Sequence, residues 1–241
     1  MEKKVLHDYE QLSRVTADCI IDFVNDKPTS FLCFAGGTTP LRTYELLVEA
    51  HNDEKVSFKD CKFVSLDEWV GLGKNIKGSC HHTLYNKVFK PLSIAEEKIC
   101  YFNGLASNLE NECHRVDDFI FKNGPIDLML LGIGMNGHIG FNEPGVNPAL
   151  YSHVIELDQV TKQVSGKYFD EKIDAPLGIT LGMKHIMEAN KAILIANGEK
   201  KADIVKAGLE GEITTDIPAS WLQNHRNISL FLDKGAASKL K

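Results

Sequence analysis

The feature that most constrains the fold of this chain is an apolar run, residues 126–131, that leads directly into a glycine-rich stretch, residues 132–145. An apolar run of this length is typical of a strand buried on both faces of a parallel sheet. The stretch after it carries one imidazole, His138, and one carboxylate, Glu143, with little other bulk. Ligands of open α/β proteins bind beyond the carboxyl ends of the strands, so this turn is a candidate active site.

The order of strand, loop and helix recurs along the chain. Further apolar runs predict strands at residues 30–35, 61–66, 192–196 and 228–232. Apolar periodicity and helix-start signals predict helices near residues 7–25, 40–50, 79–89, 107–122 and 199–207. This alternation predicts a single α/β domain over residues 1–241, an open, mostly parallel sheet of modified Rossmann type with helices on both faces. Residues 67–78 are expected to form a loop and residues 157–175 a mobile lid.

Composition narrows the class of ligand and the cellular setting. The formal net charge of −6 is spread along 241 residues without a charged block, so neither nucleic acid nor an anionic membrane is expected as a partner. No apolar run approaches the roughly 20 residues that cross a bilayer, and residues 1–10 lack a signal-peptide pattern, so a cytoplasmic location is expected. The six cysteines are scattered, and the adjacent Cys80, His81 and His82 cannot complete a tetrahedral set, so no metal site is expected.

The glycines at positions 132, 134 and 137 also fit the dinucleotide-binding pattern Gly-x-Gly-x-x-Gly, with Glu156 and Asp158 about twenty residues further on. A Rossmann turn must open a full helix whose N-terminus faces the pyrophosphate, whereas Pro144 and Gly145 interrupt the chain soon after the last glycine. The sequence therefore favours glycines that let the backbone approach a small ligand.

A second loop has the composition of a phosphate site. Residues Gly36, Gly37, Thr38 and Thr39 precede Pro40, which suits the first position of a helix. Free backbone N–H groups and two hydroxyls at a helix N-terminus suit a small anion, although a Gly-Gly pair before a helix is often only a turn. Lys200 and Lys201, at the start of a later predicted helix, are candidate cationic partners or solvated surface lysines.

Two further positions carry groups that can transfer protons. Asp67 directly follows a predicted strand, beside Trp69, and is either a turn residue or a partly desolvated general base. His138 lies five residues before Glu143, and is either a structural hydrogen-bond donor or half of a proton-transfer pair in which the carboxylate stabilises the imidazolium.

Together these loops resemble the glucosamine-6-phosphate deaminase/isomerase family, and within it most closely the galactosamine-6-phosphate isomerase/deaminase branch. The similar segments are residues 36–40, 65–72, 132–145, 179–182 and 217–221. The related 6-phosphogluconolactonases share the fold and a Gly-His loop but lack the Phe-Asn-Glu-Pro continuation found at residues 141–144.

The resemblance implies isomerisation and deamination of a 2-amino-2-deoxyhexose 6-phosphate, most closely galactosamine 6-phosphate, without a metal or another cofactor. It assigns ring opening to His138 with Glu143, and proton transfer from C2 to C1 to Asp67. The sugar phosphate would lie on residues 36–39, with Lys201 as the family's phosphate-binding lysine.

Two positions depart from the family pattern. Asn136 stands where the glucosamine-6-phosphate enzymes usually carry Asp, and it can orient His138 by hydrogen bonding but supplies no charge. The galactosamine-type branch also carries Asn there, so Asn136 is interpreted as a branch marker and a catalytic residue. Lys167 replaces the family's phosphate-binding arginine, a point charge in place of a bidentate fork.

Three alternatives stay open at this point: glucosamine 6-phosphate as the substrate, a 6-phosphogluconolactonase-like hydrolase on the same fold, and a non-catalytic sugar-phosphate sensor. A homo-oligomer is a further expectation.

Overall fold

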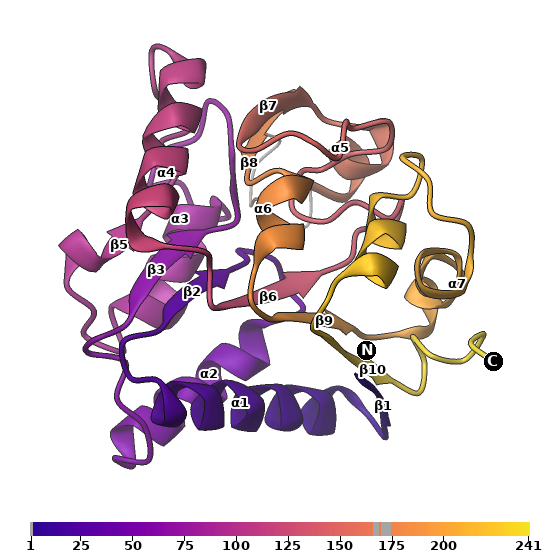
Figure 1. The fold of residues 1–241 in the computed structure, drawn as a ribbon, viewed down its shortest axis with the longest axis horizontal. Helices are drawn as coiled ribbons and strands as arrows, with labels where there is room; N and C mark the ends of the chain where they lie inside the picture. The colour runs from indigo at the N-terminus through magenta and orange to yellow at the C-terminus, as the bar shows by residue number, and fades with distance from the viewer. Residues whose placement is uncertain (1, 166–168, 170–174) are drawn as a thin grey trace.

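Seven strands form the central sheet in the computed structural model of the protein, which describes residues 2–165, 169 and 175–241 (Figure 1). In order across the sheet they are β1 (Glu2–Leu6), β10 (Ile228–Asp233), β9 (Ala192–Ala196), β6 (Leu128–Gly132), β2 (Phe31–Phe34), β3 (Lys62–Ser65) and β5 (Ile99–Cys100). All the pairings between them are parallel. The chain runs outward in one direction from β2 and in the other from β6, so the topological switch point lies between these two central strands.

The central strands are apolar on both faces because each face packs into a different core. In β2, Phe31 and Cys33 belong to one hydrophobic cluster, whereas Leu32 and Phe34 belong to the other. Successive side chains of a strand point to opposite faces, so a strand covered on both sides needs a continuous apolar run. This is why these runs could be identified as strands from the sequence.

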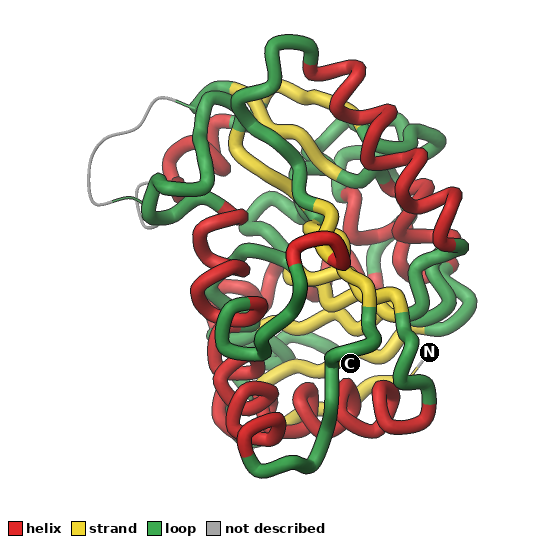
Figure 2. The backbone as a smooth tube through the Cα atoms, turned by 90° about the vertical axis from the view of Figure 1, so that its left-hand side faces the viewer, coloured by secondary structure: helices red, strands yellow, loops and turns green. Residues whose placement is uncertain are grey.

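Helices cover the two faces of the sheet (Figures 1 and 2). One core contains residues of α1 (Tyr9–Asp26), α2 (Leu41–Asn52), α3 (Cys80–Leu84) and the π-helical segment Tyr85–Phe89. The other contains residues of α4 (Leu109–Asn123), α6 (Met183–Glu188), α7 (Ala202–Glu210) and the 3₁₀ segment Pro218–Asn224. The predicted α/β fold with helices on both faces of a mostly parallel sheet is therefore confirmed.

A second, smaller sheet was not predicted. Its antiparallel strands are β4 (Asp67–Trp69), β8 (Leu177–Thr180) and β7 (His153–Glu156). The prediction that residues 67–78 form a loop is therefore wrong for the first three of them. Asp67 pairs with Thr180, a partner far away in sequence that gives no local signal.

Two edge strands of the main sheet were also missed. In β1 only Leu6 is buried, and the exposed lysines Lys3 and Lys4 suppress the alternation that identifies a strand. Charged side chains are a common way to protect a sheet edge from pairing with other chains. The edge strand β5 has only two residues, too few for a pattern.

The predicted lid at residues 157–175 begins with α5 (Gln159–Ser165). Residues 166–168 and 170–174, which include the predicted phosphate ligand Lys167, lie outside the described residues. Across the part of the chain that the structure describes, no helix is both long and apolar enough to span a membrane.

Candidate active site

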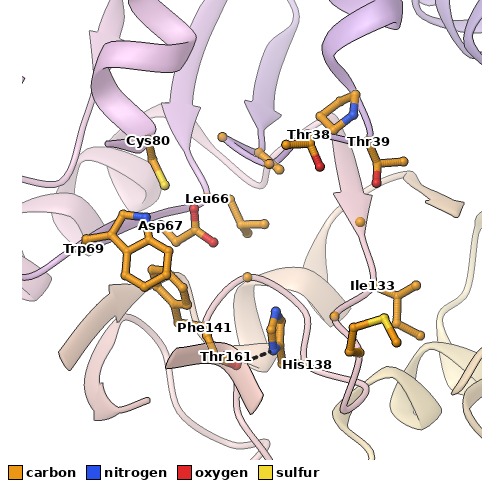
Figure 3. Close-up of a pocket in the computed structure, with 18 of the residues that line it drawn as sticks. Thr38, Thr39, Leu66, Asp67, Trp69, Cys80, Ile133, His138, Phe141 and Thr161 are labelled. Atoms are coloured by element: carbon orange, nitrogen blue, oxygen red, sulfur yellow. Dashed lines mark hydrogen bonds between the residues drawn. The ribbon is translucent and has the colours of Figure 1, made fainter. Parts of the chain in front are cut away.

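A cavity of about 200 Å³ opens at the switch point of the sheet, between β2 and β6 (Figure 3). Its wall is formed by the loop after β2, by β4, by the loop after β6, by α5 and by the segment before α7. The segments that follow residues 35, 66 and 131 thus meet at one cavity.

The loop of residues 36–39 forms one side of the cavity, and Thr38 and Thr39 lie there in Figure 3. The loop leads into α2 with Pro40 as the cap residue, and the Tyr9 hydroxyl donates to the Thr39 carbonyl at 2.9 Å. A Cβ added at Gly36 would come within 2.7 Å of the Cys80 Cβ, so only glycine lets the loop lie this close to α3. The first N–H groups of α2 already have partners, because Leu41 donates to the Thr38 carbonyl at 3.3 Å and Arg42 to the Tyr9 hydroxyl at 3.2 Å. The donors for an anion on this side of the cavity are therefore those of the loop of residues 36–39 itself, its backbone N–H groups and two hydroxyls.

The two candidate lysines are separated by the structure. Lys201 lines the cavity, and its ammonium donates to the Ile133 carbonyl at the end of β6. Lys200 is exposed and does not line the cavity. Only Lys201 is thus placed to meet a ligand held by residues 36–39.

Asp67 lies at the start of β4, with its carboxylate toward the cavity (Figure 3). Only 8% of the residue is exposed, and burial raises the pKa of its carboxyl group to about 6, against the smaller lowering effects of the Cys80 thiol and of His138. Trp69 supports this apolar wall, because its ring packs edge-on against Phe141 at 4.7 Å between centroids. A carboxylate with few donors and a raised pKa suits proton abstraction near neutral pH.

The neighbouring Glu68 does not line the cavity. Its carboxylate accepts three backbone hydrogen bonds, from the N–H groups of Trp69 at 2.8 Å, Cys80 at 3.0 Å and His81 at 2.8 Å. Burial nevertheless raises its pKa to about 7. Glu68 thus ties β4, directly after Asp67, to the start of α3.

His138 lies in the loop after β6, directly over Gly134. A Cβ added at Gly134 would come within 2.3 Å of the His138 ring, and the Gly134 N–H donates to the His138 carbonyl at 2.9 Å. The imidazole ring therefore packs directly against the backbone of Gly134. Its Nδ1 lies 3.4 Å from Glu143 Oε2 and 3.1 Å from the Thr161 hydroxyl, and the other ring nitrogen points into the cavity in Figure 3.

Asn136 bonds to the main chain of His138 and to Glu143. Its Nδ2 donates to Glu143 Oε2 at 2.9 Å, and its Oδ1 accepts from the His138 backbone N–H at 3.2 Å. The expectation that Asn136 orients His138 thus holds for the main chain, whereas the described contacts give it no hydrogen bond to the imidazole ring. Its amide acts instead on the carboxylate that faces this ring.

Glu143 is an ionised group in this network. Burial acts to raise its pKa, but hydrogen bonds from His138, Thr161 and Asn136 outweigh that effect and hold the pKa below its usual value. Thr161, from α5, was not predicted. Its neighbours in the sequence carry no catalytic pattern, and only the fold brings it next to His138.

The structure also bears on the other ligands considered. Between β6 and β7 the chain forms turns without a helix, so the glycine pattern at residues 132–137 lacks the helix of a dinucleotide site. Within residues 2–165, 169 and 175–241, no three His, Cys, Asp or Glu side chains are grouped as a metal site would require.

Comparison with known proteins identifies the family of this chain. The model of the family described as glucosamine-6-phosphate isomerases/6-phosphogluconolactonase matches residues 7–231. The chain belongs to this family. The predicted membership of the deaminase/isomerase family, and with it the expectation of an enzyme, is confirmed.

Relatives that match over nearly their whole length are named glucosamine-6-phosphate deaminase. A protein of Clostridium acetobutylicum named glucosamine-6-phosphate deaminase is 37% identical over 241 residues, covering 100% of both chains. One of Clostridium novyi with that name is 41% identical over 234 residues, 97% of each chain.

Solved structures agree on the fold of this family member. A monomeric glucosamine-6-phosphate deaminase matches with a TM-score of 0.95 and 35% identity, over 99% of this chain and 100% of that chain. A 6-phosphogluconolactonase of Trypanosoma brucei, 20% identical with a TM-score of 0.77 over 100% of this chain and 98% of its own, shares the fold alone. The oligomeric state and the cytoplasmic location of this chain stay predictions.

Proposed function

We propose that this enzyme converts a 2-amino-2-deoxyhexose 6-phosphate, with glucosamine 6-phosphate as the first candidate, into a ketohexose 6-phosphate and ammonia. The observation that carries the proposal is the convergence of Asp67, His138 and the loop of residues 36–39 on one cavity, with Glu143 in contact with the imidazole of His138. The full-length relatives named glucosamine-6-phosphate deaminase support this choice of sugar.

Phosphate binding positions the sugar. The backbone N–H groups of residues 36–39, the Thr38 and Thr39 hydroxyls and the Lys201 ammonium provide hydrogen-bond donors for the 6-phosphate on one side of the cavity. Lys167 stays a predicted further ligand of this group. The anchored end leaves C1 and C2 to face Asp67 and His138.

Ring opening is the first chemical step. The cavity-facing nitrogen of His138 takes the proton from the C1 hydroxyl and returns it to the ring oxygen, which breaks the bond between C1 and that oxygen. The Glu143 carboxylate, 3.4 Å from Nδ1, stabilises the imidazolium that forms between the two transfers. The product of this step is the open-chain aldehyde.

Asp67 then moves a proton between carbons. Its carboxylate takes the proton from C2, giving an enolamine with a double bond between C1 and C2, and returns it to C1. The nitrogen at C2 gives up a proton and the oxygen at C1 gains one as the imine forms, and water then hydrolyses this imine to a ketone and ammonia. A carboxyl group with a pKa of about 6 is able both to accept and to release a proton near neutral pH.

The test measures both products with both sugars. Purified enzyme is incubated with glucosamine 6-phosphate and, separately, with galactosamine 6-phosphate, and ammonium and ketose phosphate are determined; the Asp67→Asn variant is the control. Equal amounts of ammonium and ketose phosphate support the proposal. Hydrolysis of 6-phosphogluconolactone without ammonium from either sugar identifies a lactonase instead, and ligand-induced thermal stabilisation without turnover identifies a sensor.

Galactosamine 6-phosphate is the second candidate, and Asn136 favours it as the branch marker described above. If that interpretation is right, Asn136→Asp shifts the ratio of kcat/KM for the two C4 epimers toward glucosamine 6-phosphate. An unchanged ratio contradicts a role for position 136 in substrate choice.

A further inference from the structure

The network around His138 contains a hydroxyl that the proposed chemistry has not used. Thr161 is 5% exposed and lines the cavity from α5, and its Oγ1 lies 3.1 Å from His138 Nδ1 (Figure 3). This contact is shorter than the 3.4 Å between Nδ1 and Glu143 Oε2. An N–H···O hydrogen bond is most often about 2.9 to 3.0 Å long, so Thr161 is the better placed of the two partners.

The protons of this network can be assigned from what each group can donate. Glu143 is ionised and only accepts, and its Oε2 lies 3.4 Å from Nδ1 of His138. A lone pair on Nδ1 would face this negative charge, so Nδ1 carries a proton and the Thr161 hydroxyl, at 3.1 Å, accepts from it. The proton of the neutral imidazole then lies on Nδ1, and the cavity-facing Nε2 keeps its lone pair.

We propose that Thr161 is a positioning residue for His138: its hydroxyl accepts from Nδ1–H, beside the Glu143 carboxylate, and so holds the imidazole ring in one orientation. The proposal rests on the proposed function, because it concerns the nitrogen that acts in ring opening. During that step Nε2 takes the proton of the C1 hydroxyl and passes it to the ring oxygen, while the protons on Nδ1 and on Thr161 stay in place.

The contact between Thr161 and His138 joins two separate elements of the fold. Asn136, His138 and Glu143 all belong to the loop after β6, whereas Thr161 comes from α5, a separate element beyond β7. The orientation of the imidazole therefore depends on α5 lying over the cavity. Substitutions in this network are expected to be non-additive, because the groups act through one another.

The experiment isolates ring opening. In an Asp67→Asn background the C2 step is blocked, and the rate of exchange between the α and β anomers of glucosamine 6-phosphate, measured by NMR magnetisation transfer, reports ring opening alone. Adding Thr161→Val, which keeps the shape and removes the hydroxyl, should slow this enzyme-catalysed exchange about tenfold, the factor expected for one hydrogen bond. Thr161→Ser should restore most of the rate.

Turnover in the otherwise wild-type enzyme gives a second readout. Thr161→Val should lower kcat about tenfold with KM changed less than about twofold, because the hydroxyl acts on His138 and not on the phosphate loop. In a Glu143→Gln background the same change should have a clearly smaller effect. Thr16→Val is the matched control: it removes a buried hydroxyl that bonds to Leu12 in α1, and it should leave kcat unchanged.

The outcomes separate the two proposals. If the wild-type enzyme releases no ammonium and the Asp67→Asn variant does not speed up anomer exchange, the proposed function has failed. If the wild type is active but Thr161→Val matches it in anomer exchange and in kcat, or if Thr161→Val and Glu143→Gln act additively, the positioning role of Thr161 is wrong while the function stands.

Discussion

Two buried carboxylates serve one cavity, Asp67 in its wall and Glu143 in contact with the cavity-lining His138, and their surroundings move their pKa values in opposite directions. Asp67, at the start of β4, has its pKa raised to about 6 mainly by burial. Glu143, in the loop after β6, is also buried, yet its pKa is lowered by the hydrogen bonds it accepts and by the nearby His138. The donors and charges around a carboxylate, together with its burial, decide which form is stable.

This difference assigns different work to the two groups. A carboxylate that meets few donors keeps its affinity for protons and can take one from carbon, as proposed for Asp67. A carboxylate held by His138, Thr161 and Asn136 stays charged and can stabilise an imidazolium, as proposed for Glu143. Pairs of titratable groups with separated pKa values are typical of acid–base active sites.

The largest expected effect comes from Asp67→Asn. The amide cannot accept the C2 proton, so exchange of that proton with solvent deuterium should fall by about 10³-fold or more. Binding of the sugar phosphate, measured by calorimetry, should survive because the phosphate loop is untouched. Exchange at the wild-type rate in this variant contradicts the base role of Asp67.

The same substitution should stabilise the fold. A folded-state pKa of about 6, against 3.8 for the ordinary group, means that ionised Asp67 destabilises the native state by up to about 3 kcal/mol at pH 7. As the pH falls from about 6 to 3.8, Asp67 becomes protonated in the native state first, so the advantage of Asn over Asp should shrink and then vanish. Urea unfolding at pH 7 and pH 4 measures this; an equal difference at both values is the contrary result.

Glu143→Gln should be milder than the loss of Asp67. Glutamine keeps the shape and can still bond to Asn136 and Thr161, but it has no charge for the imidazolium, so kcat should fall between about tenfold and a hundredfold. Anomer exchange of the sugar should fall in parallel, because the lost step is ring opening. If Glu143→Gln slows C2 exchange without slowing anomer exchange, the role assigned to Glu143 in ring opening is wrong.

The pH profile distinguishes the two carboxylates without mutation. Asp67 must be ionised to act, so kcat/KM should fall about tenfold per pH unit below pH 6. Glu143, with its lowered pKa, stays ionised through this range and should add no second limb there. A profile that is flat from pH 7 down to pH 5 contradicts the raised pKa of Asp67 or its role.

The smallest effect is expected outside the surroundings of both carboxylates. Lys201→Ala removes a cavity-lining ammonium and should raise KM about fivefold to tenfold, the range for a charge-assisted hydrogen bond that partly survives through other donors. Lys200→Ala, an exposed neighbour, is the matched control and should leave KM unchanged. Neither variant should move the acid limb assigned to Asp67.

The main sheet could be predicted because its central strands are apolar on both faces, as Phe31 to Phe34 in β2 show. The edge strand β1, with Lys3 and Lys4 exposed, and β4, paired with a strand more than a hundred residues away, could not, because non-local pairing leaves no mark in a local pattern. Both the main sheet and the second sheet contribute to the site.

The candidate site likewise contains residues that could be predicted from the sequence and residues that could not. Asp67 could be proposed because it directly follows an apolar strand, and His138 and Glu143 because they lie in the glycine-rich loop after β6. Thr161 could not be proposed, because it lies in α5, beyond β7 in the chain, and only the fold brings this helix to the cavity. Residue type alone could not distinguish Lys201, which lines the cavity, from its exposed neighbour Lys200. Only the family resemblance singled out Lys201.

Gly134 has a consequence for how this protein can evolve. Every codon change that alters glycine introduces at least a Cβ, and here that atom would lie 2.3 Å from the His138 ring. No substitution at this position is conservative, because even alanine would displace the imidazole ring of His138. We therefore expect Gly134 to be fixed for as long as His138 is used, whereas Gly37, where an added Cβ meets nothing within 4 Å, is sterically open to change.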